Sequence, residues 1–112
     1  MDLKMRRVVI FTGQMPRMAA FYRDVLGLRQ VSDNDGWKDF DAGGCNIALH
    51  NGTPEVGKRP PKLMFYCDDV AATREVLVKR GAKMGKLRSG SGLDLCDGKD
   101  PDGNSIGLSN RK

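Results

Sequence analysis

Hydrophobic and polar positions follow the same pattern twice along this chain of 112 residues. A β-branched and aromatic run over 6–12 leads into a helical pattern that ends at Gly27. A similar run over 62–67 leads into a helical pattern over 70–80 that ends at Gly81. Each half then continues with short apolar segments separated by turn residues, which is typical of strands. The repeat predicts two equivalent βαβββ units.

The first unit is predicted to cover residues 1–52. Met18, Phe21, Tyr22 and Val25 recur at helical spacing and give this helix one apolar face, while Pro16 fits its first turn. The predicted strands are 6–12, 28–32, 37–42 and 45–50, and the polar segment 33–36 is a turn.

A linker over 53–61, rich in Gly and Pro, separates this unit from a second one over 62–112. The second helix follows a cap at Asp68 or Asp69. The predicted strands are 62–67, 82–87, 93–96 and 105–109, with a flexible Ser- and Gly-rich loop over 88–92. Because neither half is long enough for a well-protected core of its own, we expect one domain over 1–112.

Composition and charge narrow the class of partner. The formal charge is +5, but Lys and Arg are scattered rather than clustered, which favours an anionic small ligand over nucleic acid. No apolar run approaches the ~20 residues that span a bilayer, so we expect no membrane partner. Three cysteines without a CxxC spacing indicate reduced thiols and a cytoplasmic protein.

Two motifs carry a resemblance to a known family. The helix end Phe21–Leu28 is similar to the "FYxxvLGl" motif of the vicinal oxygen chelate superfamily, and Asp100–Ile106 is similar to its "DPdGnxi" turn. That superfamily includes glyoxalase I, extradiol dioxygenases and bleomycin-resistance proteins. The resemblance covers nearly the whole chain. It implies an α+β fold in which two βαβββ units form a curved mixed sheet, a half-barrel around a ligand cleft.

The resemblance also implies a divalent metal in the catalytic members, bound by the first and last strand of each unit. Those positions fall on Arg7, Ala48, Lys62 and Gly107. Ala and Gly have no donor side chain, and Lys and Arg are cations without a free lone pair near neutral pH. We therefore expect no metal, no cofactor and no catalytic residue at these positions.

Strand alternation assigns a second set of residues to the face that would line the cleft. This face mixes apolar, aromatic and polar side chains, as small-molecule pockets do. Arg7 and Lys62 would supply charge-assisted hydrogen bonds to an anionic or polar ligand. The predicted ligand-binding residues are Arg7, Val9, Phe11, Trp37, His50, Lys62, Met64 and Tyr66.

Other chemistry-bearing residues have simpler interpretations. His50 is the only histidine and ends a strand, where a surface position is expected rather than a general base. Asp39 and Asp41 share one strand face, and we interpret them as a solvated edge.

Two functions remain open. The first is a metal-free small-molecule binding protein of the glyoxalase and bleomycin-resistance type. The alternative is a metal-dependent glyoxalase- or dioxygenase-type enzyme whose ligands lie elsewhere, and whether the chain is an enzyme is left undecided. We expect a homodimer, because many relatives of this type form one and the strand edges are exposed.

Overall fold

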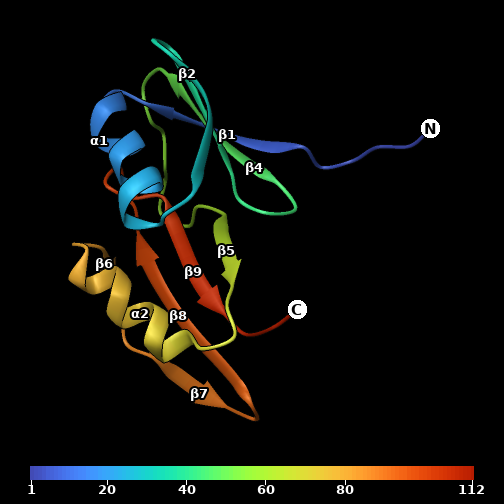
Figure 1. The fold of residues 1–112 in the computed structure, drawn as a ribbon, viewed down its shortest axis with the longest axis vertical. Helices are drawn as coiled ribbons and strands as arrows, with labels where there is room; N and C mark the ends of the chain where they lie inside the picture. Colours follow the sequence, from blue (N-terminus) through green and yellow to red (C-terminus); the bar gives the residue numbers. More distant parts are fainter. The chain divides into compact units, whose positions relative to one another are not determined.

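Each half of the chain builds its own β-sheet with one helix against it (Figure 1). The computed structural model describes all residues from 1 to 112. It divides into unit 1, Met1–Glu55, and unit 2, Val56–Lys112, and this boundary lies inside the segment expected to be a linker. The α+β fold class and the repeated sheet topology are those predicted from the sequence.

Unit 1 contains a four-stranded sheet in the order β1-β4-β3-β2. Strand β1 runs parallel to β4, and the other neighbours are antiparallel. The elements in chain order are β1 (Arg7–Thr12), α1 (Met15–Ala20), η1 (Phe21–Val25), β2 (Arg29–Asn34), β3 (Trp37–Asp41) and β4 (Asn46–Asn51).

The helical segment of unit 1 follows the predicted apolar face. Met18, Phe21 and Tyr22 are buried against the sheet, and Pro16 occupies the first turn. The last turn, η1, is wider than an α-helix, because the amide of Leu26 donates to the carbonyl of Phe21 at 2.9 Å. Gly27 then takes a positive φ of 74°, which a side chain would disfavour, and the helix ends there.

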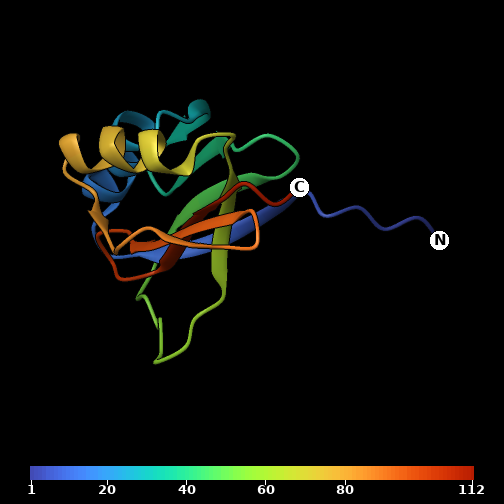
Figure 2. The ribbon, with the colours of Figure 1, turned by 90° about the horizontal axis from the view of Figure 1, so that it is seen from below.

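Unit 2 repeats this plan, with β5 parallel to β9 as β1 is to β4. Its sheet has the order β5-β9-β8-β6, and β7 pairs with another part of β8. Figure 2 shows α2 lying along one side of this sheet. The elements are β5 (Lys62–Tyr66), α2 (Val70–Lys79), β6 (Lys83–Met84), β7 (Arg88–Gly90), β8 (Leu93–Lys99) and β9 (Ser105–Ser109).

The middle of unit 2 differs from the sequence prediction. The expected strand over 82–87 is reduced to Lys83–Met84, and the expected loop over 88–92 contains β7. β8 is also longer than predicted, so that one strand pairs with both short ones. The prediction failed because an edge strand needs only backbone hydrogen bonds, which a polar Arg-Ser-Gly segment supplies. Ser91 and Gly92, both at positive φ, make the hairpin turn into β8.

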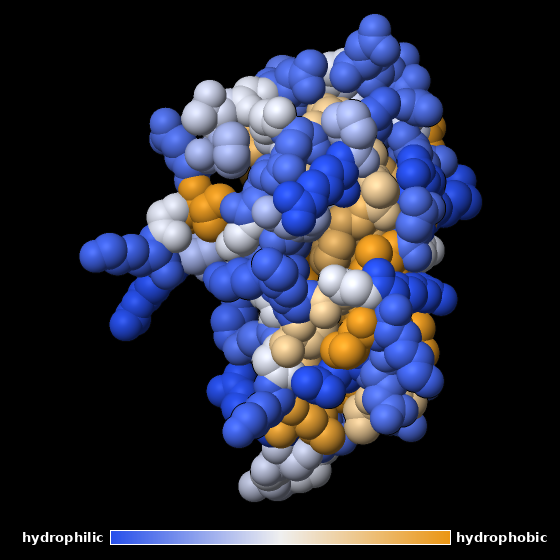
Figure 3. All heavy atoms as spheres, turned by 90° about the vertical axis from the view of Figure 1, so that its left-hand side faces the viewer, coloured by the Kyte–Doolittle hydropathy of each residue, from blue (hydrophilic) through white to orange (hydrophobic).

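Each sheet separates a core face from an open face, the face that its helix does not cover. Among the predicted core-face residues, Ile10, Ile47, Leu49, Ile106 and Leu108 are buried, while Val8, Leu63 and Phe65 are half-buried. Val9, Phe11, Met64 and Tyr66 alternate with them and are exposed. Figure 3 shows surfaces on which hydrophilic atoms dominate and apolar patches stand between them. The helices are too short and too polar to cross a lipid bilayer.

The turn between β8 and β9 depends on one buried carboxylate. Asp100 is 4 % exposed and accepts from the backbone amides of Asp102 and Asn104, at 3.0 and 2.9 Å. It also accepts from the Asn104 side-chain amide at 2.8 Å. Gly103 has a φ of 91°, which explains the glycine of this motif. The carboxylate therefore holds the turn that sets the register of the last strand.

Replacing this carboxylate should destabilise the chain. We expect Asp100→Ala to lower the free energy of unfolding by about 2–3 kcal/mol, because buried amide groups lose their acceptor. Asp35→Ala, in the exposed turn of unit 1, should change it by less than about 0.5 kcal/mol. Urea unfolding followed by circular dichroism measures both. Equal effects of the two substitutions would contradict this role of Asp100.

Candidate functional site

The cation on the first strand of unit 1 is held by a carboxylate two strands away. Arg7 on β1 donates from a terminal guanidinium nitrogen to Oδ2 of Asp39 on β3 at 3.2 Å. Strand β4 lies between them, and Asp39 is paired with Ala48 of that strand. The Arg7 side chain therefore crosses β4 beside Ala48, which has no exposed surface.

Unit 2 has the same arrangement at the matched positions. Lys62 on β5 donates from Nζ to Oδ2 of Asp97 on β8 at 3.1 Å. Strand β9 lies between them, and Asp97 is paired with Gly107. The repeat therefore includes the carboxylate as well as the cation and the small residue. Sequence reasoning missed Asp97, although an aspartate precedes Ala48 and Gly107 by nearly the same number of residues.

The small residue under each ion pair leaves room for it. A Cβ on Gly107 would lie 2.5 Å from Sδ of Met64 and 3.3 Å from Oδ1 of Asp97. A longer side chain there would displace Met64 and crowd the carboxylate. The absence of a side chain at Gly107 therefore leaves room for Met64 and for the carboxylate of Asp97.

The residues at the metal positions of the family do not fit a metal ion. Ala48 and Gly107 offer no donor, and Arg7 and Lys62 are cations already bound to carboxylates. Elsewhere in the chain, His, Cys, Asp and Glu side chains form no group of three that could hold a metal. The chemistry of the side chains, rather than their placement, makes the expected ligand set unsuitable.

The two ion pairs differ in burial. The Asp39 side chain is only 7 % exposed and also accepts from the Asn46 amide at 3.3 Å, so its charge is well compensated. Its Oδ1 and the Nε of Arg7 are buried without a partner. Asp97 is 38 % exposed and is shared by Lys62 and Arg88, the latter at 2.8 Å. Unit 1 therefore holds a neutral pair and unit 2 an excess of positive charge.

The expectation that Asp39 and Asp41 form a solvated edge is wrong for Asp39. Asp39 is buried where it binds the Arg7 side chain. Strand alternation gives only the face on which a residue lies and does not predict this contact. Asp41 is more exposed, accepts from the Gly43 amide at 2.9 Å and pairs with Arg29 at 3.0 Å. The Gly43 amide, followed by the Arg29 guanidinium, lowers the pKa of Asp41 below its usual value.

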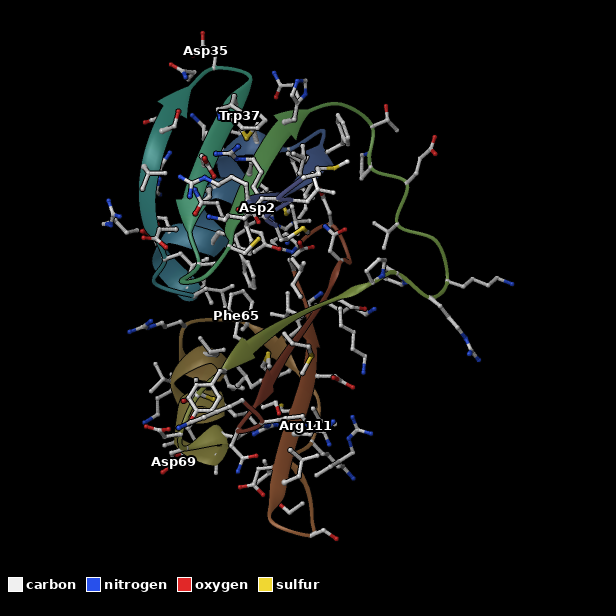
Figure 4. All side chains as sticks on the ribbon, turned by 90° about the vertical axis from the view of Figure 1, so that its right-hand side faces the viewer. Asp2, Asp35, Trp37, Phe65, Asp69 and Arg111 are labelled. Atoms are coloured by element: carbon white, nitrogen blue, oxygen red, sulfur yellow. The ribbon has the colours of Figure 1, made fainter.

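Three aromatic rings lie side by side on the open face of unit 1. Phe11, His50 and Trp37 occupy one cross-strand row over β1, β4 and β3, which we call the aromatic row. The ring centroids of Phe11 and His50 are 5.3 Å apart, and those of His50 and Trp37 are 6.1 Å apart. Trp37 lies on the side of the sheet away from α1 (Figure 4). The Arg7 guanidinium carbon is 6.0 Å from the centre of the Trp37 ring.

Five of the predicted ligand-binding residues thus share one face of unit 1. Val9 lies between Arg7 and Phe11 on β1 and is 41 % exposed, while Phe11 is 50 % exposed. His50 is exposed, as expected, and its Nδ1 lies 2.7 Å from the carbonyl of Asn51. Because a carbonyl only accepts, Nδ1 is the donor in this contact.

The other three predicted residues follow β5 in unit 2. Lys62, Met64 and Tyr66 alternate along this strand and are exposed. The Tyr66 hydroxyl donates a hydrogen bond to Asp68, which raises the pKa of Tyr66 above its ordinary value. The phenol therefore stays protonated near neutral pH and is a poor acid–base catalyst.

The ion pair of unit 1 gives a direct stability test. We expect Asp39→Ala to lower the free energy of unfolding by about 1–3 kcal/mol, because Arg7 is left half-buried without a partner. Replacing both residues, Arg7→Met with Asp39→Leu, should restore most of the loss. Asp24→Ala, which breaks the exposed Arg23–Asp24 pair, should have little effect in the same urea titration. A double variant as unstable as the single one would contradict this account.

Comparisons with known proteins agree with the fold. A protein of unknown function from Agrobacterium tumefaciens strain C58 is 24% identical, with a TM-score of 0.80 and coverage of 97% of this chain and 94% of that one. A lactoylglutathione lyase from Agrobacterium tumefaciens is 21% identical, with a TM-score of 0.78 and coverage of 96% and 93%. TnmS3, an antibiotic binding protein from Streptomyces sp. CB03234, is 21% identical, with a TM-score of 0.80 and coverage of 96% and 94%.

No curated protein sequence matches the chain. The sequence model of one family does match, and it covers residues 4–108, which include most of each unit and both ion pairs. The chain belongs to the Glyoxalase/Bleomycin resistance protein/Dioxygenase superfamily.

Proposed function

We propose that this chain is a small-molecule binding protein of the superfamily that works without a metal ion at the usual positions. The observation that carries the proposal is the aromatic row of unit 1, which lies beside an internally neutralised ion pair. Phe11 and His50 in this row are exposed, and Trp37 is half-buried. Exposed aromatic rings with a few fixed polar groups are what small-molecule sites use for affinity and orientation.

The geometry favours a planar aromatic ligand in unit 1. Phe11 and Trp37 present apolar ring surface, on which a flat ligand would stack. Arg7 lies over Trp37 and keeps guanidinium donors beyond the one bound to Asp39, so it would fix a polar group of the ligand. Because Asp39 compensates the Arg7 charge, this face favours a neutral polar ligand over the anion expected from the sequence.

The relatives support this class of function. TnmS3 is described as an antibiotic binding protein, and another structural neighbour, also from Streptomyces sp. CB03234, as a glyoxalase/bleomycin resistance protein. The enzyme alternative would need metal ligands from a partner chain, because this chain alone assembles no group of three metal-binding side chains. The proposal includes the homodimer and the cytoplasmic location expected from the sequence.

Trp37 is the only tryptophan, so its fluorescence reports on the aromatic row alone. We expect at least one member of a panel of planar aromatic antibiotics to change the emission of Trp37 in a saturable way, at concentrations on the order of 10 μM. Phe11→Ala should weaken this binding roughly tenfold, because about 1.4 kcal/mol of stacking is lost.

The control is Val76→Ala, which truncates an exposed apolar side chain on α2. It should bind as the original chain does. Thermal shift of the same samples separates binding at the aromatic row from binding elsewhere. Ligands that stabilise the fold without changing Trp37, and without sensitivity to Phe11→Ala, would place the site elsewhere and overturn the proposal.

A further inference from the structure

A hollow of about 450 Å³ opens on unit 2, at the place where β5 and β9 begin and β8 ends. Its polar lining consists of Lys62, Lys83, Lys99, Asp97 and Ser105. The lining therefore contains three ammonium groups and one carboxylate. None of these residues belongs to the aromatic row of unit 1.

Four of these residues form one continuous row across the sheet. Lys83 on β6 is paired with Lys99 on β8, and Lys99 is paired with Ser105 on β9. Ser105 is in turn paired with Lys62 on β5. Directly paired residues on neighbouring strands project to the same face. We call this Lys-Lys-Ser-Lys set the basic row.

The positive charge of the basic row is not neutralised within the chain. Asp97 is shared between Lys62 and Arg88, so one carboxylate serves two cations. Lys83 and Lys99 form no ion pair, and Lys99 donates to the hydroxyl of Ser105 at 3.0 Å. Like charges directly opposite each other on neighbouring strands repel, which makes the Lys83–Lys99 pair unfavourable without an anion between them.

Unit 1 provides an internal comparison. The matched row there is Arg7, Asn46, Asp41 and Arg29, on strands in the same order. Asp41 occupies the position of Lys99 and pairs with Arg29 at 3.0 Å. The first unit thus compensates its row with a carboxylate, while the second places a third cation at that position. The repeat therefore points to Lys99 as the residue that turns a row containing a carboxylate into a row of three cations.

We propose that the basic row of unit 2 binds the phosphate group of a small phosphorylated molecule. Lysine ammonium groups are strong point-charge ligands for phosphate, and the Ser105 hydroxyl adds a neutral donor between them. The hollow is larger than one phosphate group, so a phosphorylated small molecule has room in it. This site stands independently of the aromatic row and of the function proposed for it.

The test uses pyrophosphate as the probe, with isothermal titration calorimetry at low ionic strength. The original chain should bind one pyrophosphate per chain with a dissociation constant of roughly 10–100 μM. Lys99→Gln and Lys83→Gln should each weaken binding about tenfold. Lys79→Gln, which removes the same charge from the end of α2, should weaken it less than about twofold.

A second variant keeps the test independent of folding defects. Lys99→Asp copies the arrangement of unit 1 and removes the repulsion with Lys83. It should abolish pyrophosphate binding while raising the melting temperature measured without the anion. Binding that survives in Lys99→Asp, or equal losses in Lys99→Gln and Lys79→Gln, would overturn the proposal. Binding of an oligonucleotide without binding of pyrophosphate would also overturn the proposal. The positive charge would then act as a dispersed basic surface for nucleic acid and not as a site for one phosphorylated small molecule.

Discussion

In each unit a cation on the first strand reaches over the last strand to an aspartate on the strand beyond it. The pairs are Arg7 with Asp39 and Lys62 with Asp97. A charged group that is removed from water needs a partner. A half-buried guanidinium without one lowers the free energy of unfolding by several times more than the intact pair raises it. In unit 2 a Cβ at Gly107 would crowd Met64 and Asp97, so a small residue suits the position below that pair. The paired cations and the small residues together leave no metal-binding side chain at the positions where the superfamily resemblance implies one.

The matched ion pairs of the two units have different surroundings. In unit 1 the pair is covered by neighbouring side chains and lies beside three aromatic rings, which makes the face apolar and nearly neutral. In unit 2 it is open to water and belongs to a row of lysines. The frame that holds each cation is the same in the two units, but the residues around it differ. Lys99 of unit 2 stands at the position of Asp41, and Tyr66, Ser109 and Leu95 stand at the positions of Phe11, His50 and Trp37. The two faces therefore suit different ligand chemistries.

Much of the fold could be predicted from the sequence, because it depends on local patterns. Helical spacing placed Met18, Phe21 and Tyr22 on one buried face, and alternation separated the core face of each sheet from its open face. The strand β7 was missed because its residues are polar and its pairing depends only on backbone groups. The conclusion that Arg7, Ala48, Lys62 and Gly107 do not suit a metal rests on side-chain chemistry alone and stays a prediction. The partners of the two cations were not predicted, because strands distant in sequence bring them together, and Asp39 was wrongly expected to be solvated.

The central claim is that ion pairs occupy the metal positions of this superfamily, and metal content tests it most directly. Elemental analysis of untagged protein, purified without chelator, would be followed by thermal shift with nickel, zinc, manganese and iron(II). The account predicts substoichiometric metal and no stabilisation by any of these ions, because two of the four positions are cations and two have no donor. One bound metal per chain, with a rise in melting temperature when that metal is added, would contradict it.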